Sequence, residues 1–236
     1  MRRFWDKAEA AADADSYAIM LDGRPVRLPS GAVLRPAQAR LAEAIAAEWQ
    51  RAGGAPGGEM SFADVPLTRL AGTAQQRIAP DPGPTIQALA AYAQSDLLCY
   101  RAAAPEALVH RQARAWQPWL DWAALELDAP LRSTSGVMPV TQPPEALLAI
   151  QRALAAHAPE RLAALGLAVP ALGSVVLGLA MAAGQLGAAA AHGLAALDEL
   201  FQAEHWGEDS EAAARRARIG GEIALAARFM ELSGPQ

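Results

Sequence analysis

Cysteine, histidine and lysine are scarce in this sequence of 236 residues. Cys99 is the single cysteine and cannot form an intramolecular disulfide, which fits a protein of a reducing compartment. The four histidines lie far apart, and none are paired at the i, i+4 spacing that puts two zinc ligands on one helix face. The glycine patterns of phosphate-binding loops, G-x-G-x-x-G and G-x-x-x-x-G-K-S/T, are also missing. We therefore expect no disulfide, no metal site and no nucleotide cofactor.

Positive charge is also in short supply, with 20 basic residues against 25 acidic ones and a formal net charge of −5. This balance disfavours a general nucleic-acid-binding role, which needs a basic surface. All the basic residues except Lys7 are arginine, which suits planar pairing with carboxylates. Hydrophobic residues make up 53% of the chain and charged residues 19%, so we expect an ordered globular protein and not a disordered one.

A long hydrophobic run of the kind that spans a membrane is lacking too. The stretch 168–197 carries no charge, but its strongly apolar part, residues 172–183, is shorter than the ~20 residues a spanning helix needs. We interpret that part as a buried helix opened by Pro170. The opening residues, MRRFWDKAEAAADAD, contain no apolar run of a signal peptide and do not resemble a transit peptide. A cytoplasmic location is therefore expected.

No catalytic residue stands out. Residues 172–176 (LGSVV) are the nearest match to a nucleophile elbow, but the second glycine is missing and the segment falls in the predicted apolar helix. We interpret Ser174 as a small residue that allows close helix packing.

Alternating apolar residues predict a small antiparallel sheet near the N-terminus. Residues 17–21 alternate as a strand does, and Asp22-Gly23 is a strong signal for a tight turn. Strands at 26–28 and 32–34 should follow, the first of them short or at an edge because Pro25 and Pro29 cannot donate to a ladder. A helix, a strand at 60–65 and a helix from residue 66 come next. The apolar stripe of the first helix is Leu41, Ile45 and Trp49.

The proline-rich segment 79–84 (APDPGP) predicts a boundary between two domains, because three prolines in six residues forbid a continuous helix. Before it the pattern mixes strands and helices, and after it nearly every segment has helical periodicity. The predicted fold class is therefore α+β, with a small sheet-plus-helix domain at 1–78, a linker at 79–84 and a larger all-α domain at 85–236. We expect Pro118 to kink or divide a helix that starts at Pro105, and a short extended piece at 137–141.

The segment 92–122 should be a hub of the core of the larger domain. It holds three of the six tryptophans, Trp116, Trp119 and Trp122, and large aromatics bury the most area per residue. Asp96 and Arg101 stand among these apolar residues. They fit an ion pair across a turn that orients the helix junction, and they equally fit polar contacts to a partner.

Residues 197–211 (LDELFQAEHWGEDSE) form the most acidic stretch, with six carboxylates and no Lys or Arg. A charge run is usually a solvated face, and Glu208 fits the start of a helix, where acids suit the helix dipole. Glu199 and Glu204 are different, because they flank a helix end beside large aromatics, including Trp206. Carboxylates next to apolar anchors are typical of a binding surface. Both interpretations stay open for Glu199 and Glu204.

Several segments spread along nearly the whole chain match one family pattern in one order. They are residues 3–5 (RFW) with Lys7, 21–27 (LDGRPVR) with Pro29, 44–49 (AIAAEW), 66–71 (PLTRLA) with Thr73 and Ala74, 95–101 (SDLLCYR), Gln112, 116–122 (WQPWLDW), 172–174 (LGS), 197–202 (LDELFQ) and 206–208 (WGE). Taken together they resemble the assembly chaperone of the F-type ATP synthase that binds its alpha subunit, and Gln75-Gln76 is a departure from the pattern expected there. The start of the chain leaves no room for a mitochondrial presequence, so the resemblance is to a bacterial member; a processed eukaryotic form would lie in the mitochondrial matrix.

The resemblance implies an ATP-independent chaperone without enzymatic activity or cofactor. Its client is the free alpha subunit, which it keeps from aggregating until the beta subunit takes its place. The acid of the family's L-x-E-x-x-Q segment corresponds to Glu199, so charge reversal there should abolish rescue of the client and leave the melting temperature nearly unchanged. The expected client surface comprises Glu199, Glu204, Trp206 and Glu208, with Asp96 and Arg101 as further contacts. The resemblance also implies a monomer when free and a transient one-to-one complex with the client.

Two other functions remain as alternatives from the residues alone. The chain fits a helical scaffold or adaptor that binds a different protein through its acidic surface. It also fits an enzyme with a pocket between its two domains, although no nucleophile–base pattern is present.

Overall fold

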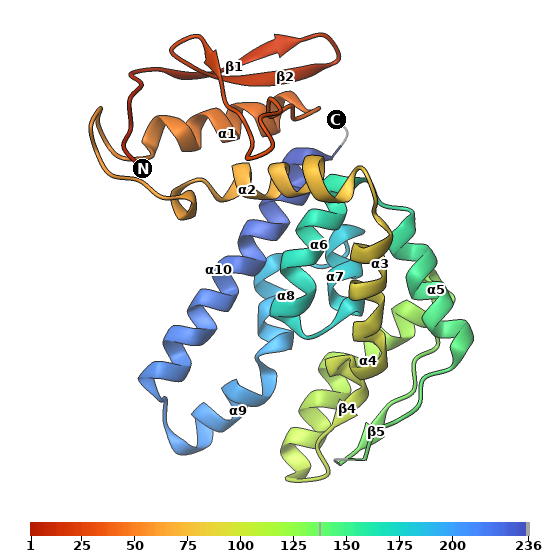
Figure 1. Ribbon diagram of the computed structural model, residues 1–236. Helices are drawn as coiled ribbons and strands as arrows, with labels where there is room; N and C mark the ends of the chain where they lie inside the picture. Colours follow the sequence, from red (N-terminus) through yellow and green to blue (C-terminus); the bar gives the residue numbers. More distant parts are fainter. Residues whose placement is uncertain (137, 235–236) are drawn as a thin grey trace. The chain divides into compact units, whose positions relative to one another are not determined.

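The structure is a computed structural model that describes residues 1–136 and 138–234 (Figure 1). The extended piece expected at 137–141 begins on Val137, which lies outside the described residues. The chain divides into two compact units. The first holds Met1–Pro82 with two short later segments, 158–164 and 228–234, and the second holds Gly83–His157 and Leu165–Ala227. The predicted independent domains at 1–78 and 85–236 stay a prediction.

The sheet of the first unit has three antiparallel strands in the order β1-β2-β3, which are Ala8–Asp13, Ser16–Leu21 and Arg24–Pro25. Asp22 and Gly23, with φ of 46° and 77°, make the predicted tight turn between β2 and β3. The strand predicted at 26–28 is displaced to Arg24–Pro25, but it is short and lies at the edge of the sheet, as the prolines predict. The strand expected at 32–34 is reduced to an isolated bridge between Arg27 and Val33.

Helix α1 (Ala39–Arg51) packs on β1 and β2, as Figure 1 shows. Its buried face includes the predicted stripe Leu41, Ile45 and Trp49. The Trp49 indole N–H donates to the Thr68 hydroxyl at 3.0 Å, which links α1 to helix α2 (Pro66–Thr73). The strand expected at 60–65 is wrong: Ser61 caps a 3-10 turn at Phe62–Asp64, because its hydroxyl accepts the Ala63 N–H at 3.1 Å.

The second unit is built from helices around a fully buried α7, which lies among its neighbours in Figure 1. With the three strands of the first unit, these helices confirm the α+β fold class. Two short strands, β4 (Tyr100–Arg101) and β5 (Thr134–Ser135), pair in parallel. The helices from α3 onward are α3 (Gly83–Ala90), α4 (Glu106–Glu126), α5 (Pro144–Ala155), α6 (Pro159–Leu172), α7 (Val175–Ala182), α8 (Ala188–Ala195), α9 (Leu197–Trp206) and α10 (Ser210–Ser233).

Two prolines lie inside helices. Helix α4 continues through Pro118, so Pro118 does not divide it, and a kink at Pro118 stays a prediction. Pro170 lies inside α6 and does not open the apolar helix. The break falls instead at Gly173, whose φ of 65° is accessible to glycine at no cost in strain. Among the residues described, no helix is both long and apolar enough to cross a membrane.

Candidate functional site

Asp96 is completely buried and ties the residues before β4 to the start of α7. Its carboxylate accepts hydrogen bonds from the Ser174 hydroxyl at 3.0 Å, the Leu98 N–H at 3.1 Å and the Val176 N–H at 3.2 Å. Loss of hydration on burial raises the pKa of Asp96 to about 6, against the lowering effect of these hydrogen bonds. Ser174 also caps α7 by accepting the Leu177 N–H at 3.1 Å, which corrects its expected place inside a helix.

Arg101 is half-buried and does not pair with Asp96, so the expected ion pair across the turn is wrong. Its guanidinium donates to the Leu98 carbonyl at 2.7 Å and to the Gln112 carbonyl at 3.3 Å, and it lies 5.6 Å from the ring centroid of Trp116. These contacts join β4 to α4, and they stabilise the positive charge of Arg101 within the protein. Both Asp96 and Arg101 therefore have structural roles, and their contact with a client stays a prediction.

Helix α9 presents a mixed surface of an aromatic ring and carboxylates. Leu197 and Phe201 are buried, whereas Trp206 at the end of the helix is 76% exposed. The His205 ring stacks on Phe201 at 4.2 Å between centroids. Gly207, with φ of 91°, ends the helix and turns the chain toward α10. The exposed indole is therefore held at the end of an ordered helix and not in a loop.

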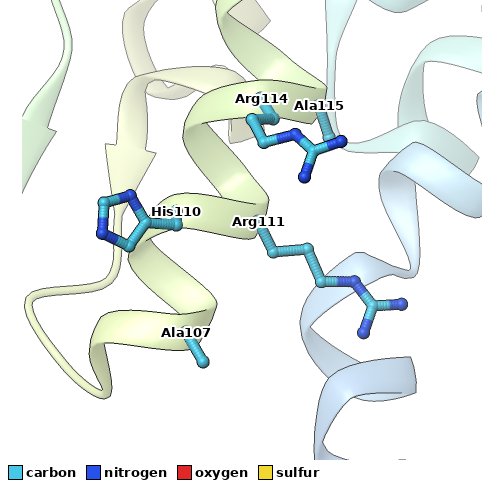
Figure 2. Close-up of a pocket in the computed structure, with 5 residues that line it drawn as sticks. All are labelled: Ala107, His110, Arg111, Arg114 and Ala115. Carbon is cyan, nitrogen blue, oxygen red and sulfur yellow. The ribbon is translucent and has the colours of Figure 1, made fainter.

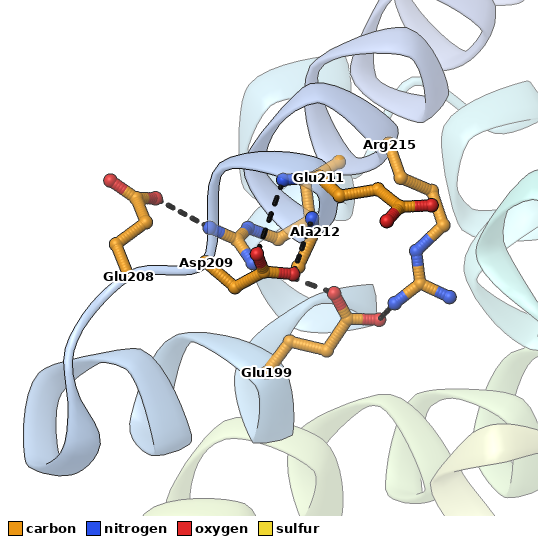
Figure 3. Close-up of polar contacts among 7 residues, drawn as sticks. Glu199, Glu208, Asp209, Glu211, Ala212 and Arg215 are labelled. Atoms are coloured by element: carbon orange, nitrogen blue, oxygen red, sulfur yellow. Dashed lines mark hydrogen bonds and ion pairs between the residues drawn. The ribbon is translucent and has the colours of Figure 1, made fainter.

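Glu199 faces two arginines of α10 (Figure 3). Its Oε1 accepts from Arg215 at 2.9 Å, and its Oε2 lies 3.6 Å from the guanidinium of Arg216, too far for a hydrogen bond. Arg216 is mostly buried and also donates to Glu208 at 2.5 Å. Asp209 caps α10 by accepting the Ala212 N–H at 3.1 Å.

Glu204 connects α9 to α4 through a two-pronged ion pair with Arg111. The two hydrogen bonds measure 2.5 and 2.8 Å, and the Arg111 guanidinium lowers the pKa of the Glu204 carboxyl. One residue along α4, the Gln112 amide donates to Asp198 at 2.8 Å. Five of the six carboxylates of the predicted acidic stretch thus have partners, and the Glu211 side chain has none in the part of the chain that the structure describes.

A shallow hollow of about 560 Å³ lies on the exposed side of α4 (Figure 2). Its lining includes His110, Arg111 and Arg114, which sequence reasoning did not single out. Their i, i+1, i+4 spacing on a predicted helix could have indicated a shared basic face. Because Arg111 is the partner of Glu204, this basic face adjoins the acidic residues of α9.

A family model described as ATP12 chaperone protein matches residues 2–124. The solved structure of Atp12 from Paracoccus denitrificans is similar over 99% of this chain and 98% of that chain, with 42% identity and a TM-score of 0.91, and a point mutant of the same protein gives the same values. The chain belongs to the ATP12 chaperone family. The Atu1473 protein of Agrobacterium tumefaciens is also similar, at 37% identity and a TM-score of 0.88 over 98% of this chain and 85% of that chain. The family resemblance drawn from the sequence is confirmed.

In this member of the ATP12 chaperone family, four of the six predicted site residues lie on α9 and the turn after it, with Glu199 in the first turn of the helix. They are Glu199, Glu204, Trp206 and Glu208. Asp96 and Arg101 belong to the helix junction described above. Within the described residues, no group of three His, Cys, Asp or Glu side chains is arranged to hold a metal ion. The segment from α9 to the start of α10 thus combines one exposed indole with surface ion pairs, and its contact with a client stays a prediction.

Proposed function

We propose that this chain is an ATP-independent assembly chaperone of the F-type ATP synthase. It binds the free alpha subunit, prevents its aggregation and hands it over to the beta subunit. In this proposal the protein has no enzymatic activity, is a cytoplasmic monomer when free, and forms a transient one-to-one complex with its client. Membership of the ATP12 chaperone family supports the chaperone role, and the exposed Trp206 carries the placement of the client surface.

Trp206 has the properties of an interface anchor. Its indole is 76% exposed at the end of an ordered helix, where it costs little conformational entropy to bind. Tryptophan is enriched among the residues that dominate binding energy, and truncation of such an anchor costs about 2 kcal/mol or more. A free subunit that exposes apolar surface offers the complementary partner.

The ion pairs around Trp206 suit reversible binding. Glu204 and Glu199 are already paired with Arg111 and Arg215, so an arginine or lysine of the client must exchange with an internal partner. The exchange preserves charge pairing while fixing the register of the complex. Because each new pair replaces an old one, its net gain is small, and the beta subunit can displace the chaperone.

The first test measures capture of the purified alpha subunit by the immobilised full-length chain. The second follows aggregation of the diluted alpha subunit by light scattering, with and without the chain. Trp206→Ala should weaken capture about thirtyfold and abolish protection from aggregation. Leu125→Ala is the matched control, because Leu125 is 80% exposed on α4 and has no assigned role. Both variants should keep the wild-type melting temperature.

Glu199→Gln is the appropriate second variant. Charge reversal at Glu199 would bring a third cation against Arg215 and Arg216, so a loss of function could follow from local unfolding. The neutral amide keeps the shape and removes the charge. Weaker capture at an unchanged melting temperature supports a client contact, whereas a large fall in melting temperature assigns Glu199 a structural role. If wild-type chain fails to capture the alpha subunit and captures an unrelated protein, the adaptor alternative replaces this proposal.

A further inference from the structure

A second surface of the molecule, in the first unit, consists of two adjoining hollows. One measures about 340 Å³ and the other about 220 Å³. They share four lining residues, Leu28, Pro29, Phe62 and Thr68, so they form one continuous groove. The groove lies between the turn after β3 and helix α2, and we refer to it as the α2 groove.

The α2 groove is apolar in its floor and along one edge. Leu28 forms part of the floor and packs so tightly against α2 that a Cβ on Gly72 would lie 2.9 Å from its Cδ2 atom. Phe62 is 58% exposed and Phe4 is 64% exposed, and both line the groove. Exposed apolar residues gathered at a groove mark an interaction site, whereas isolated ones need no explanation. A side chain larger than that of Gly72 would therefore force Leu28 to shift and would change the shape of the floor.

The charge of the α2 groove is opposite to that of the whole chain. Its lining contains Arg24, Arg27, Arg69 and Arg77 and not one carboxylate, although the net charge of the protein is −5. Arg27 donates to the Gly31 carbonyl at 2.7 Å. The ion pairs found among the described residues involve none of these four arginines. Arg24 interacts electrostatically with the nearby Asp22 carboxylate, which leaves Arg27, Arg69 and Arg77 without an ion-pair partner among the described residues. These three guanidinium groups beside an apolar floor select an occupant that is both acidic and apolar.

We propose that the α2 groove binds an extended polypeptide segment that places a bulky apolar side chain beside carboxylates. The apolar side chain inserts next to Phe62 and Leu28, and the carboxylates pair with Arg69 and Arg77 at the rim. Such a segment of the client is the occupant. Only the identity of the client rests on the proposed function above, since the chemistry of the groove is independent of Trp206 and α9. A nucleic acid is disfavoured as the occupant by the net charge of −5 of the whole chain.

The probe for this proposal is a fluorescein-labelled nonapeptide with one central phenylalanine flanked by glutamates. Two matched peptides replace the phenylalanine by alanine or every glutamate by glutamine. Fluorescence anisotropy with the full-length chain should show saturable binding of the first peptide and about tenfold weaker binding of each matched peptide. Binding of the first peptide should also weaken with salt, because guanidinium–carboxylate pairs at the surface are screened.

Variants of the chain locate the site. Phe62→Ala and, separately, the double change Arg69→Glu and Arg77→Glu should each weaken peptide binding about tenfold or more. The matched control is on α5, where Leu148→Ala removes a side chain with 59% exposure and Arg152→Glu reverses an exposed charge. The control variants should bind the peptide as wild type does. Equal melting temperatures for all variants exclude unfolding as the cause.

Three results would overturn the proposal. The first is equal binding of all three peptides or no binding of any, and the second is equal loss in the α5 control. The third is a dimer in sedimentation velocity that Phe62→Ala dissociates, which would assign the groove to a second copy of this chain. None of these three results bears on the proposed function, and failure of the proposed function would not produce any of them. The peptide assay contains no alpha subunit, and capture through Trp206 is measured with Phe62 intact.

Discussion

Replacing the buried Asp96 by asparagine should change how stability depends on pH. The Asp96 carboxylate accepts two hydrogen bonds from the start of α7 and one from the Leu98 N–H, and an asparagine side chain has the same shape but cannot ionise. In wild type the folded state holds a proton on Asp96 more tightly than the unfolded chain does, since burial raises its pKa from 3.8 to about 6. In the Asp96→Asn variant this proton uptake is absent.

The sign and size follow from linkage. A carboxyl with a raised pKa in the folded state destabilises the fold at high pH, and the penalty is lost as pH falls from about 6 to about 4. The full penalty is about 3 kcal/mol, because each tenfold difference in proton affinity corresponds to about 1.4 kcal/mol. Between about pH 5 and about pH 7 the penalty grows by roughly 1 kcal/mol. The free energy of unfolding of Asp96→Asn minus that of wild type should therefore rise by this amount.

The assay is urea denaturation of both proteins at a series of pH values at constant ionic strength. Taking the difference between the two proteins cancels the other titrating groups. The amide NH₂ of asparagine faces either the Leu98 N–H, in place of Oδ1, or both the Ser174 hydroxyl and the Val176 N–H, in place of Oδ2. Either position adds a constant offset that does not vary with pH. A difference that stays flat between about pH 5 and about pH 7, or that falls, would refute the conclusion that Asp96 is buried as an ionisable group with a raised pKa.

Two further predictions concern packing and charge in the second unit. Gly178→Ala should cost about 1–3 kcal/mol of stability, because its Cβ would lie 2.7 Å from Val169 Cγ2, whereas Gly166→Ala meets nothing within 4 Å and should stabilise α6 by about 0.5–1 kcal/mol. Thermal denaturation of the two variants tests both, and destabilisation by Gly166→Ala would contradict the geometry. Glu204→Gln removes the pair with Arg111 and should lower the melting temperature slightly at low salt and not at high salt. A loss that persists at high salt would mean that the pair is not a screened surface interaction.

Local patterns were sufficient to predict the helix α1 and the turn after β2. The stripe of Leu41, Ile45 and Trp49 reports directly on a helix with one buried face. Strand β1 (Ala8–Asp13) was missed for the opposite reason. Its sequence AEAAAD consists mostly of good helix formers, and it becomes a strand because it pairs with β2. Pairing between strands overrides local propensity, and a single sequence does not report it.

The junction of Asp96 and Ser174 shows a different limit. Both residues drew attention in the sequence, Asp96 for its charge among apolar residues and Ser174 for its place after a glycine. Their hydrogen bond joins positions 78 residues apart, which no local pattern can connect. The break before α7 was readable, however, because glycine followed by serine is typical of a helix end and a new N-cap. The long apolar run concealed it, since all eight residues of α7 are buried and look continuous with α6.

The acidic stretch 197–211 covers α9 and the start of α10. The sequence alone shows its negative charge but does not show which arginines neutralise that charge in the fold. Read locally, six carboxylates without a cation predict a bare negative surface. Folding brings Arg111 to Glu204 from 93 residues away, and Arg215 to Glu199 from the following helix. The surface is therefore paired and not strongly negative, so long-range attraction should contribute little to the proposed client binding. In that proposal the affinity comes mainly from the exposed Trp206 and the carboxylates select partners by exchange, so loss of Trp206 should cost the most.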